Sequence, residues 1–540
     1  MEMNTPKALS IFLHFAFCMV LLAACRPRTV DVGEPFSDYN DFPLLELSIA
    51  DLAEKMASGQ LTAVSITEMY LERVEAIDRS GPNLNSVIEL NPDALRIARQ
   101  LDQERAEGKT RGPLHGIPVM IKDNIDTADR MMTTAGASAL MGNYAKEDAF
   151  LVKRLRESGA VLLGKTNLSE WANFRSTRSS SGWSSRGGQT HNPYVLDRNP
   201  CGSSAGSGAA VSANLCVVAI GTETNGSIVC PSASNGVVGL KPTVGLISRS
   251  GVIPISFSQD TAGPMARTVA DAALCLGVLV GVDKKDRMSA ESSGQSLTDY
   301  TPFLKIDGLK GKRIGVWRSK FGFHEGVDAA LEPALKAIVE AGAELVDLET
   351  IIENANELRG QAFALLQYEF KDGVNAYLET ASPATGVKSL EDIIAYNYMH
   401  EGETMPFFKM EILELSQARA GLGEEAYLTA KRLIQSASRE GIDRVMHEHR
   451  LDAILAPTGG PAWCTDLING DHFGSGSSTP AAWAGYPNIT VPAGFVEGLP
   501  VGMSFFGRAW SEGELISIAY AFEQLTKARR LPEFKASISN

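Results

Sequence analysis

Cysteine is scarce in this chain, and its shortage excludes one class of protein. The 540 residues contain 7 cysteines, of which Cys18 and Cys25 lie near the N-terminus. An odd number of scattered cysteines remains, which excludes the disulfide framework of a small secreted protein. These five are Cys201, Cys216, Cys230, Cys275 and Cys464. Cys201 and Cys230 flank a serine-rich segment, and the sequence leaves open whether they approach each other.

Histidine clusters and an excess of basic residues are also missing. Only 8 histidines occur, and His447 and His449 are two residues apart, on different faces of the helix predicted there. This pattern indicates a solvated helix surface and no metal site. The 50 basic residues are outnumbered by 64 acidic ones, for a net charge of −14 and a pI of about 5.2. Such a charge argues against a nucleic-acid partner.

The first 25 residues have the pattern of an export signal. Lys7 precedes an apolar stretch, Ala8–Ala24, which ends in Leu-Ala-Ala-Cys at Cys25. This ending resembles the bacterial lipobox, which implies cleavage before Cys25 and lipidation of its thiol. An ordinary signal or an N-terminal membrane helix is the alternative, but the stretch is short for a span and is interrupted by His14.

We therefore expect a lipoprotein-type signal peptide over residues 1–24 and a polar tether over residues 25–44. The protein would be exported and anchored through the lipid on Cys25 to a bacterial membrane, at its periplasmic or extracellular face. The sequence does not distinguish the inner from the outer membrane, and it leaves the oligomeric state open.

The rest of the chain alternates between strand-like and helical segments. Helices are predicted at Ser65–Arg79, Ala149–Gly159 and Gly513–Leu525, and the middle region, Leu358–Glu440, is mostly helical and should cap a cleft. Short apolar runs predict strands at Val161–Leu163, Val217–Ile220, Val237–Leu240, Arg313–Trp317, Ala453–Leu455 and Ile489–Val491. This alternation predicts an α/β fold with helices on both faces of one sheet.

A segment dense in glycine and serine, Cys201–Pro242, contains two turns around one apolar run, Leu215–Ile220. Small residues let the backbone approach a ligand closely, and glycine permits positive φ. Two such turns beside a core strand are typical of a site where backbone N–H groups and serine hydroxyls converge. A pair of tight structural turns is the alternative.

Lys122 favours the interpretation as a site. It follows the apolar run Pro118–Ile121, so we expect it at the end of a buried strand. A lysine at a strand end is usually solvated. If it is buried near hydroxyl groups, the low dielectric favours its neutral amine, which is a competent general base for a serine.

These residues resemble the pattern of the amidase signature family. The resemblance is carried by Lys122, by Ser203 and Ser204 in GSSAGS, and by Ser227 in GTETNGSIVCPS, 24 residues after Ser203. Further matching segments are Ser258–Asp271, Ala456–Thr458 and Gly485–Phe495. The match runs from about Leu45 to the C-terminus. It implies that residues 45–540 form one amidase domain with a mixed sheet.

Two further segments, Leu168–Ser176 and Ser181–Tyr194, are most similar to the bacterial peptide amidases, which remove the C-terminal amide from peptide amides. The resemblance thus implies an amidohydrolase that cleaves a carboxamide C–N bond and releases ammonia. The alternatives are a family relative that acts on other amides or on esters, and an anchored binding protein that has lost the chemistry. The natural substrate is not given by the sequence.

The resemblance also assigns roles to residues. Ser227 would be the nucleophile, and Ser203, preceded by a cis peptide bond, would relay its proton to Lys122. The oxyanion hole would consist of the backbone N–H groups of Thr224, Asn225, Gly226 and Ser227, and no metal or organic cofactor is implied.

Four residues depart from the commonest family pattern. Asn225 replaces a glycine at a position where tolerance of positive φ matters. Val229 replaces a frequent arginine, Cys201 a frequent glycine, and Glu223 an aspartate. None of these changes removes a catalytic group.

Two segments match the sequence patterns of other enzyme motifs, but their surroundings do not fit the structures that those motifs require. Gly202–Gly206 fits the nucleophile elbow G-x-S-x-G with Ser204 as nucleophile, and Asp471 and His472 lie downstream. The elbow must follow a buried strand, whereas Asp197–Pro200 is typical of a turn.

The second motif, GAVLLGKT at Gly159–Thr166, fits the P-loop pattern. Its apolar run lies between the two glycines, where a P-loop has its phosphate-binding loop. The segment is therefore predicted to be a strand, with Lys165 at the rim of the cleft or in a structural role.

Overall fold

The computed structural model describes residues 39–538. From Pro43 onward the described residues form one compact unit. The expected signal peptide, the lipidated Cys25 and the first part of the tether lie outside the described residues. Within residues 39–538, no helix combines the length and the apolar character needed to cross a membrane.

One large mixed sheet organises the chain from Pro43 onward. Its eleven strands run in the order β1-β3-β2-β6-β8-β7-β12-β13-β11-β9-β10. The strands are β1 (Val87–Leu90), β2 (Pro118–Lys122), β3 (Val161–Thr166), β6 (Val218–Glu223), β7 (Val238–Lys241), β8 (Thr261–Ala266), β9 (Arg313–Trp317), β10 (Glu344–Leu348), β11 (Ala453–Pro457), β12 (Asn488–Val496) and β13 (Leu499–Phe506). A separate hairpin pairs β4 (Trp183–Ser184) with β5 (Gly188–Gln189).

Strands β3, β2 and β6 pair in parallel, and this pairing determines where Lys122 lies. In β2 and β6, Val119 pairs with Val218 and Ile121 with Ile220. Because the strands are parallel and in this register, their carboxyl ends lie side by side. Lys122 at the end of β2 therefore lies beside the last residues of β6. From β6 to β11 the neighbouring strands are antiparallel, and β11, β9 and β10 are parallel again.

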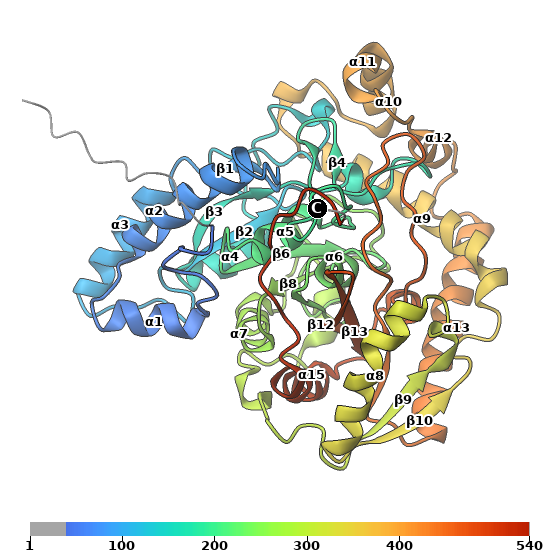
Figure 1. The fold of residues 1–540 in the computed structure, drawn as a ribbon. Helices are drawn as coiled ribbons and strands as arrows, with labels where there is room; N and C mark the ends of the chain where they lie inside the picture. The colour runs from blue at the N-terminus through green and yellow to red at the C-terminus, as the bar shows by residue number, and fades with distance from the viewer. Residues whose placement is uncertain (1–38, 539–540) are drawn as a thin grey trace, which may run out of the picture. The chain divides into compact units, whose positions relative to one another are not determined.

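Helices cover both faces of the sheet. Helices α5 and α6 contact each other and pack on the central strands, while α7, α8 and α15 form a second group. In Figure 1, α2 and α3 lie near β1 at the left with α1 below them, and β9 and β10 lie at the lower right. The helices are α1 (Ile49–Ala57), α2 (Ala63–Arg73), α3 (Ala94–Ala106), α4 (Phe150–Glu157), α5 (Ala205–Ser212), α6 (Val229–Ser234), α7 (Val269–Leu279), α8 (Glu325–Glu340), α9 (Ala355–Leu378), α10 (Leu390–Met399), α11 (Glu401–Thr404), α12 (Glu411–Gln417), α13 (Glu425–Glu448), α14 (Thr479–Ala484) and α15 (Glu512–Thr526).

The predicted α/β class is confirmed, and so is the helical middle region, which consists of α9–α13. The GAVLLGKT segment forms β3, as its apolar centre predicts, and not a phosphate-binding loop. The helix predicted at Ser65–Arg79 is present, and its geometry changes near its end. Ser65–Arg79 ends as an α-helix at Arg73 and continues as a single π-helical stretch, Val74–Arg79.

Candidate active site

Lys122 is fully buried where β2 ends. Its Nζ lies 2.7 Å from Ser203 Oγ and 2.9 Å from Thr222 Oγ1, and it also donates to Thr222 O at 3.3 Å. The register pairs Ile121 with Ile220, so Lys122 at the end of β2 lies near Gly221 and Thr222 at the end of β6. Thr222 was not predicted as a site residue, although its place two residues after the predicted strand Val217–Ile220 and just before the turn that carries Ser227 was a usable signal.

Burial lowers the pKa of Lys122 to about 7. The loss of hydration disfavours the ammonium form, and this effect exceeds the attraction of Asp260 and Glu223, which acts in the opposite direction. A large fraction of the side chain is therefore a neutral amine near neutral pH, and this neutral amine can accept a proton from the neighbouring hydroxyl.

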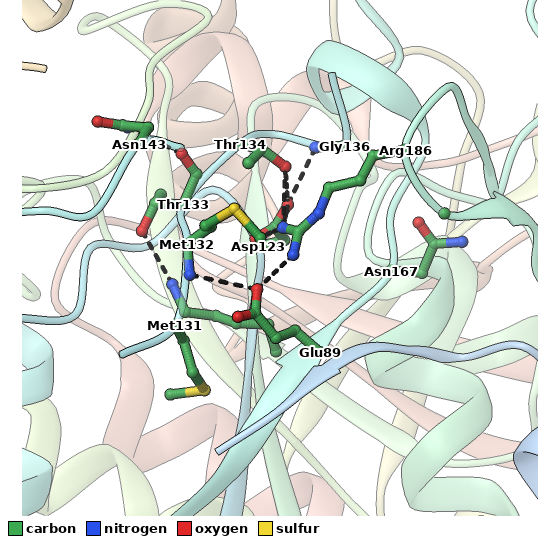
Figure 2. Close-up of polar contacts among 12 residues, drawn as sticks. Glu89, Asp123, Met131, Met132, Thr133, Thr134, Gly136, Asn143, Asn167 and Arg186 are labelled. Atoms are coloured by element: carbon green, nitrogen blue, oxygen red, sulfur yellow. Dashed lines mark hydrogen bonds and ion pairs between the residues drawn. The ribbon is translucent and has the colours of Figure 1, made fainter. Parts of the chain in front are cut away.

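The carboxylate of Asp123, the residue after Lys122, bonds groups other than Lys122. Figure 2 shows it in a cluster with Arg186, Thr134 and Glu89. Arg186 Nη1 lies 3.2 Å from Asp123 Oδ1, and the other guanidinium nitrogen, Nη2, bonds Glu89. The Gly136 N–H also donates to Asp123 at 3.2 Å. Asp123 is thereby satisfied by these groups, so it forms no close ion pair with Lys122.

The two serines of GSSAGS have different surroundings. The peptide bond between Gly202 and Ser203 is cis, as the family resemblance implies, and Ser203 is fully buried against Lys122. Ser204 is also buried, and its Oγ bonds the backbone of β6, donating to Thr222 O at 3.1 Å and accepting from Thr222 N at 3.2 Å. Ser204 begins α5 and does not follow a strand, which argues against it as an elbow nucleophile.

Ser227 lies in the turn between β6 and α6, and it is 9 % exposed. The positive φ of this turn falls on Gly226, at 87°, and not on Asn225. Glu223 Oε2 accepts the N–H groups of Ile228 at 2.8 Å and Val229 at 3.1 Å, which fixes the chain just after Ser227. The Ser227 carbonyl accepts the N–H of Ser204 at 3.2 Å. These bonds hold the turn against the segment that carries Ser203.

The backbone of this turn offers donors. Within residues 39–538, the N–H groups of Thr224, Asn225, Gly226 and Ser227 have no protein acceptor. Glycine and left-handed backbone in such a turn form the concave arrangement of N–H groups that binds anions. The four positions assigned by resemblance can therefore donate to a negatively charged oxygen.

Asp260 holds the Thr224–Ser227 turn through a hydrogen bond to Thr224. Its Oδ1 accepts from Thr224 Oγ1 at 2.6 Å, and its Oδ2 accepts from the backbone of Ile255 and Ser256. Burial raises its pKa to about 6. The loop that holds Asp260 is tied in turn to α9, because the buried Glu369 accepts from Ser258 N at 3.0 Å and bonds the hydroxyls of Ser256 and Ser258.

A cavity of about 410 Å³ opens beside the turn. Its apolar wall comes from Phe174, Ile255, Leu366, Trp463 and Phe473, while Thr224, Asn225, Gly226 and Ser227 contribute backbone. Its lining contains no lysine, arginine or histidine side chain, and Asp471 is its one charged residue. Asp471 is already bonded by Ser181, whose N–H donates at 2.9 Å. Helix α9 supplies Leu366, so the helical middle region does border the cavity, as expected.

A second cavity, of about 800 Å³, is lined by Asp260 together with residues such as Asp126, Arg249 and Tyr377. It contains none of the predicted site residues. The smaller cavity, which reaches Ser227, is the one that can present a substrate to the serines.

Cys201 and Cys230 form a disulfide, with their Cα atoms 6.1 Å apart. The sequence left this pairing open, and the scattered cysteine pattern gave no sign of it. Cys216, Cys275 and Cys464 are free, and the first two are buried, as expected of packing residues.

The remaining candidates lie away from the cavity. Lys165 is fully buried in β3 and does not line the cavity, so the role that remains for it is the structural one. His447 lies in α13 and His449 caps its end. Over the described part of the chain, no group of three or more histidine, cysteine or acidic side chains is arranged to hold a metal.

This arrangement of a buried lysine, two serines and a donor-rich turn is that of an amide-cleaving hydrolase. The chain matches the amidase family over residues 65–516 and belongs to the amidase signature family, as predicted. It is an amide-hydrolysing enzyme.

Known relatives extend over nearly the whole chain. It is 41% identical to a probable amidase of Arabidopsis thaliana, a match that covers 97% of this chain and 99% of the relative. The crystal structure of an amidase family protein from Bacillus anthracis superposes with a TM-score of 0.82 at 38% identity, covering 91% of this chain and 93% of the other. That of the peptide amidase of Stenotrophomonas maltophilia superposes with a TM-score of 0.88 at 51% identity, covering 91% and 99%.

Proposed function

We propose that this enzyme hydrolyses the C-terminal carboxamide of peptide amides through an acyl-enzyme on Ser227. The observation that carries the proposal is the 2.7 Å contact between the buried Lys122 Nζ and Ser203 Oγ, beside the cavity that Ser227 lines. The similarity to a peptide amidase at 51% identity supports this substrate class.

In the first step, the neutral Lys122 takes the proton of Ser203 while Ser203 takes the proton of Ser227. Ser227 Oγ attacks the amide carbonyl carbon as its proton leaves. Lys122 does not line the cavity, so Ser203 is the link between the buried base and the nucleophile. The same relay then runs in reverse and protonates the amide nitrogen, which leaves as ammonia.

The turn Thr224–Ser227 stabilises the oxyanion that forms at the carbonyl. One well-placed donor of this kind lowers the barrier by about 3–4 kcal/mol in other hydrolases. Water then attacks the acyl-enzyme by the same relay, and the peptide acid is released with Ser227 regenerated.

The charge of the cavity favours a neutral carboxamide. A carboxylate at the same place would lie in a partly enclosed site without a basic side chain and near Asp471. Burying an unpaired charge is costly, so the peptide acid is expected to bind weakly and to leave readily. The apolar wall accommodates the side chain that precedes the amide.

We also propose that the enzyme works outside the cytoplasm, anchored through a lipid on Cys25. The lipobox-like ending at Cys25 supports this, and so does the Cys201–Cys230 disulfide, because disulfides persist in oxidising compartments. Mass analysis of the N-terminal peptide from a membrane fraction tests it. A diacylglyceryl group on Cys25 is expected, and an unmodified Met1 terminus would contradict the proposal.

The activity is tested with a panel of short peptide amides, by following ammonia release and the mass of the product. Ser227→Ala is assayed beside the wild type. We expect conversion of amide to acid by the wild type and a loss on the order of 10⁶-fold in kcat in the variant, as for other serine nucleophiles. The matched control is Ser204→Ala, which removes a neighbouring hydroxyl bonded only to the backbone of β6.

Activity that survives in Ser227→Ala and disappears in Ser204→Ala would overturn the mechanism. Wild-type activity on simple esters or other amides but not on peptide amides would support the alternative substrate class instead.

A further inference from the structure

The Cys201–Cys230 disulfide joins the two segments that carry the serines. Cys201 is two residues before Ser203, and Cys230 is three residues after Ser227. The cysteines are 29 residues apart in sequence, and both line the cavity. The covalent link therefore lies within the wall of the site and spans the distance between the two segments.

We propose that this disulfide is a positioning element that holds Ser203 and Ser227 in register, so that its reduction slows the chemical step. The inference rests on the proposed relay, in which a proton passes between the two hydroxyls. Proton transfer needs the heavy atoms at hydrogen-bond distance, and a displacement of about 1 Å in such a site lowers the rate by as much as about 10²-fold.

Two hydrogen bonds also join the two segments. The Ser204 N–H donates to Ser227 O at 3.2 Å, and Asn235 Nδ2 donates to Pro200 O at 2.8 Å from the far end of α6. Both hydrogen bonds can lengthen without a covalent constraint. The disulfide adds a covalent constraint on the side facing the cavity.

The backbone conformation of Cys201 connects the disulfide to the position of Ser203. Cys201 has a φ of 56°, in the left-handed region, immediately before the cis bond that leads to Ser203. A non-glycine residue rarely adopts this conformation unless the surroundings impose it. Once the disulfide is open, Cys201 can move to negative φ, and that rotation shifts Ser203 directly.

A soluble dithiol can perform the reduction. Its thiolate attacks one sulfur, the second thiol closes the reagent into a cyclic disulfide, and Cys201 and Cys230 each leave as a thiol, with two electrons and two protons transferred. Cys230 is partly exposed and lines the cavity, so the attacking sulfur has a path to the bond.

The test measures kcat and KM of the full-length enzyme for a peptide amide before and after treatment with dithiothreitol, well below the unfolding temperature. Alkylation and peptide mass verify that Cys201 and Cys230 have become thiols. We expect kcat to fall by about tenfold or more while KM changes by less than about twofold. Reoxidation should restore kcat.

A second readout isolates the acylation step. The rate at which a fluorophosphonate labels Ser227 should fall with kcat, because both depend on the relay. The double variant Cys201→Ala/Cys230→Ala should match the reduced wild type and lose its response to dithiothreitol. The matched control is Cys464→Ser, which removes an exposed free thiol and should respond to the reductant as the wild type does.

The outcomes separate this inference from the proposed function. An oxidised wild type without amidase activity would overturn the proposed function. An active oxidised enzyme whose kcat stays within about twofold after verified reduction would overturn the positioning role alone. If the double variant fails to fold, reduction and reoxidation of the folded wild type decide the matter.

Discussion

Three strand-borne lysines are buried in this sheet, and only their surroundings distinguish them. Lys122 ends β2, Lys165 lies in β3, and Lys241 ends β7, and each is fully buried. Burial lowers the pKa of all three, to about 7 for Lys122 and about 8 for Lys241. Their similar positions therefore do not explain why one can be a base.

The partners of each lysine make the difference. Lys241 donates to two backbone carbonyls, Pro242 O at 3.0 Å and Tyr486 O at 2.7 Å. Lys165 bonds Ile125 O and the hydroxyl of Thr133 among acidic side chains, chiefly Asp123 and Asp126. Lys122 differs from both because it contacts a serine hydroxyl next to the cavity. Burial provides the neutral amine, and the adjoining serine gives that amine a proton to accept.

Among the variants that test the comparison of the lysines, Lys122→Met is expected to have the largest effect. Loss of the general base should lower kcat by about 10²–10⁴-fold. The folded pKa of Lys122 lies below that of the unfolded chain, so the lysine makes stability rise with pH between these values and lowers it at neutral pH. The variant should therefore melt at the same temperature or higher at pH 7. Turnover within tenfold of wild type would remove Lys122 from the mechanism.

Lys165→Met should lower the stability of the protein and leave its kcat nearly unchanged, the reverse of what is expected for Lys122→Met. Removing this amine leaves Ile125 O and the hydroxyl of Thr133 without their donor in the interior, which costs about 1–3 kcal/mol of stability. The folded fraction should keep kcat within about threefold, because Lys165 does not line the cavity. Chemical denaturation and active-site titration measure the two quantities separately. A stable but inactive Lys165→Met enzyme would break the distinction between the two lysines.

The pH dependence sharpens the comparison further. Lys122 must be neutral to accept a proton, so kcat/KM should fall as pH drops below about 7, by about tenfold per pH unit on the steep limb. The anion of Asp260 favours the charged lysine, so Asp260→Asn should move this limb to lower pH. A limb that moves to higher pH in the variant, or that is absent in the wild type, would contradict the assignment of the base.

The smallest effect is expected from His472→Ala. His472 is exposed, its Nε2 lies 3.3 Å from Asp466 Oδ2, and it does not line the cavity that reaches Ser227. A serine-histidine mechanism would need such a residue, whereas the lysine mechanism does not. We expect kcat/KM within about twofold of the wild type, on the scale of an ordinary surface substitution. A loss of a hundredfold would revive the elbow interpretation of Ser204.

Local sequence was enough to predict much of the sheet. The apolar run before Lys122 and the one inside GAVLLGKT each form a strand, because both are short, apolar and bounded by turn residues or glycine. Arg313–Trp317 has the bounds that the sequence predicts. The helix predicted at Ser65–Arg79 is present, but its last residues have π geometry, which apolar periodicity does not distinguish from α.

Contacts between distant segments were beyond local reasoning. The bond from Thr224 to Asp260 and the pairing of Cys201 with Cys230 join residues 36 and 29 positions apart. Glu369 reaches the Ser256–Ser258 loop across more than a hundred residues. All three contacts depend on how distant strands and turns come together, and the third also depends on how α9 packs, so none of them follows from the residues around a single position.

The position of Glu369 limits how the substrate specificity of this enzyme can change during evolution. It lies three residues after Leu366, so one turn of α9 both borders the cavity and anchors the loop that holds Asp260. Exchanging the whole of α9 for another helix would remove Glu369, and with it the anchor of the loop whose Asp260 holds the Thr224–Ser227 turn. We expect lineages derived from this sequence to vary their substrates by single exchanges at positions such as Leu366, with the carboxylate one turn later inherited unchanged.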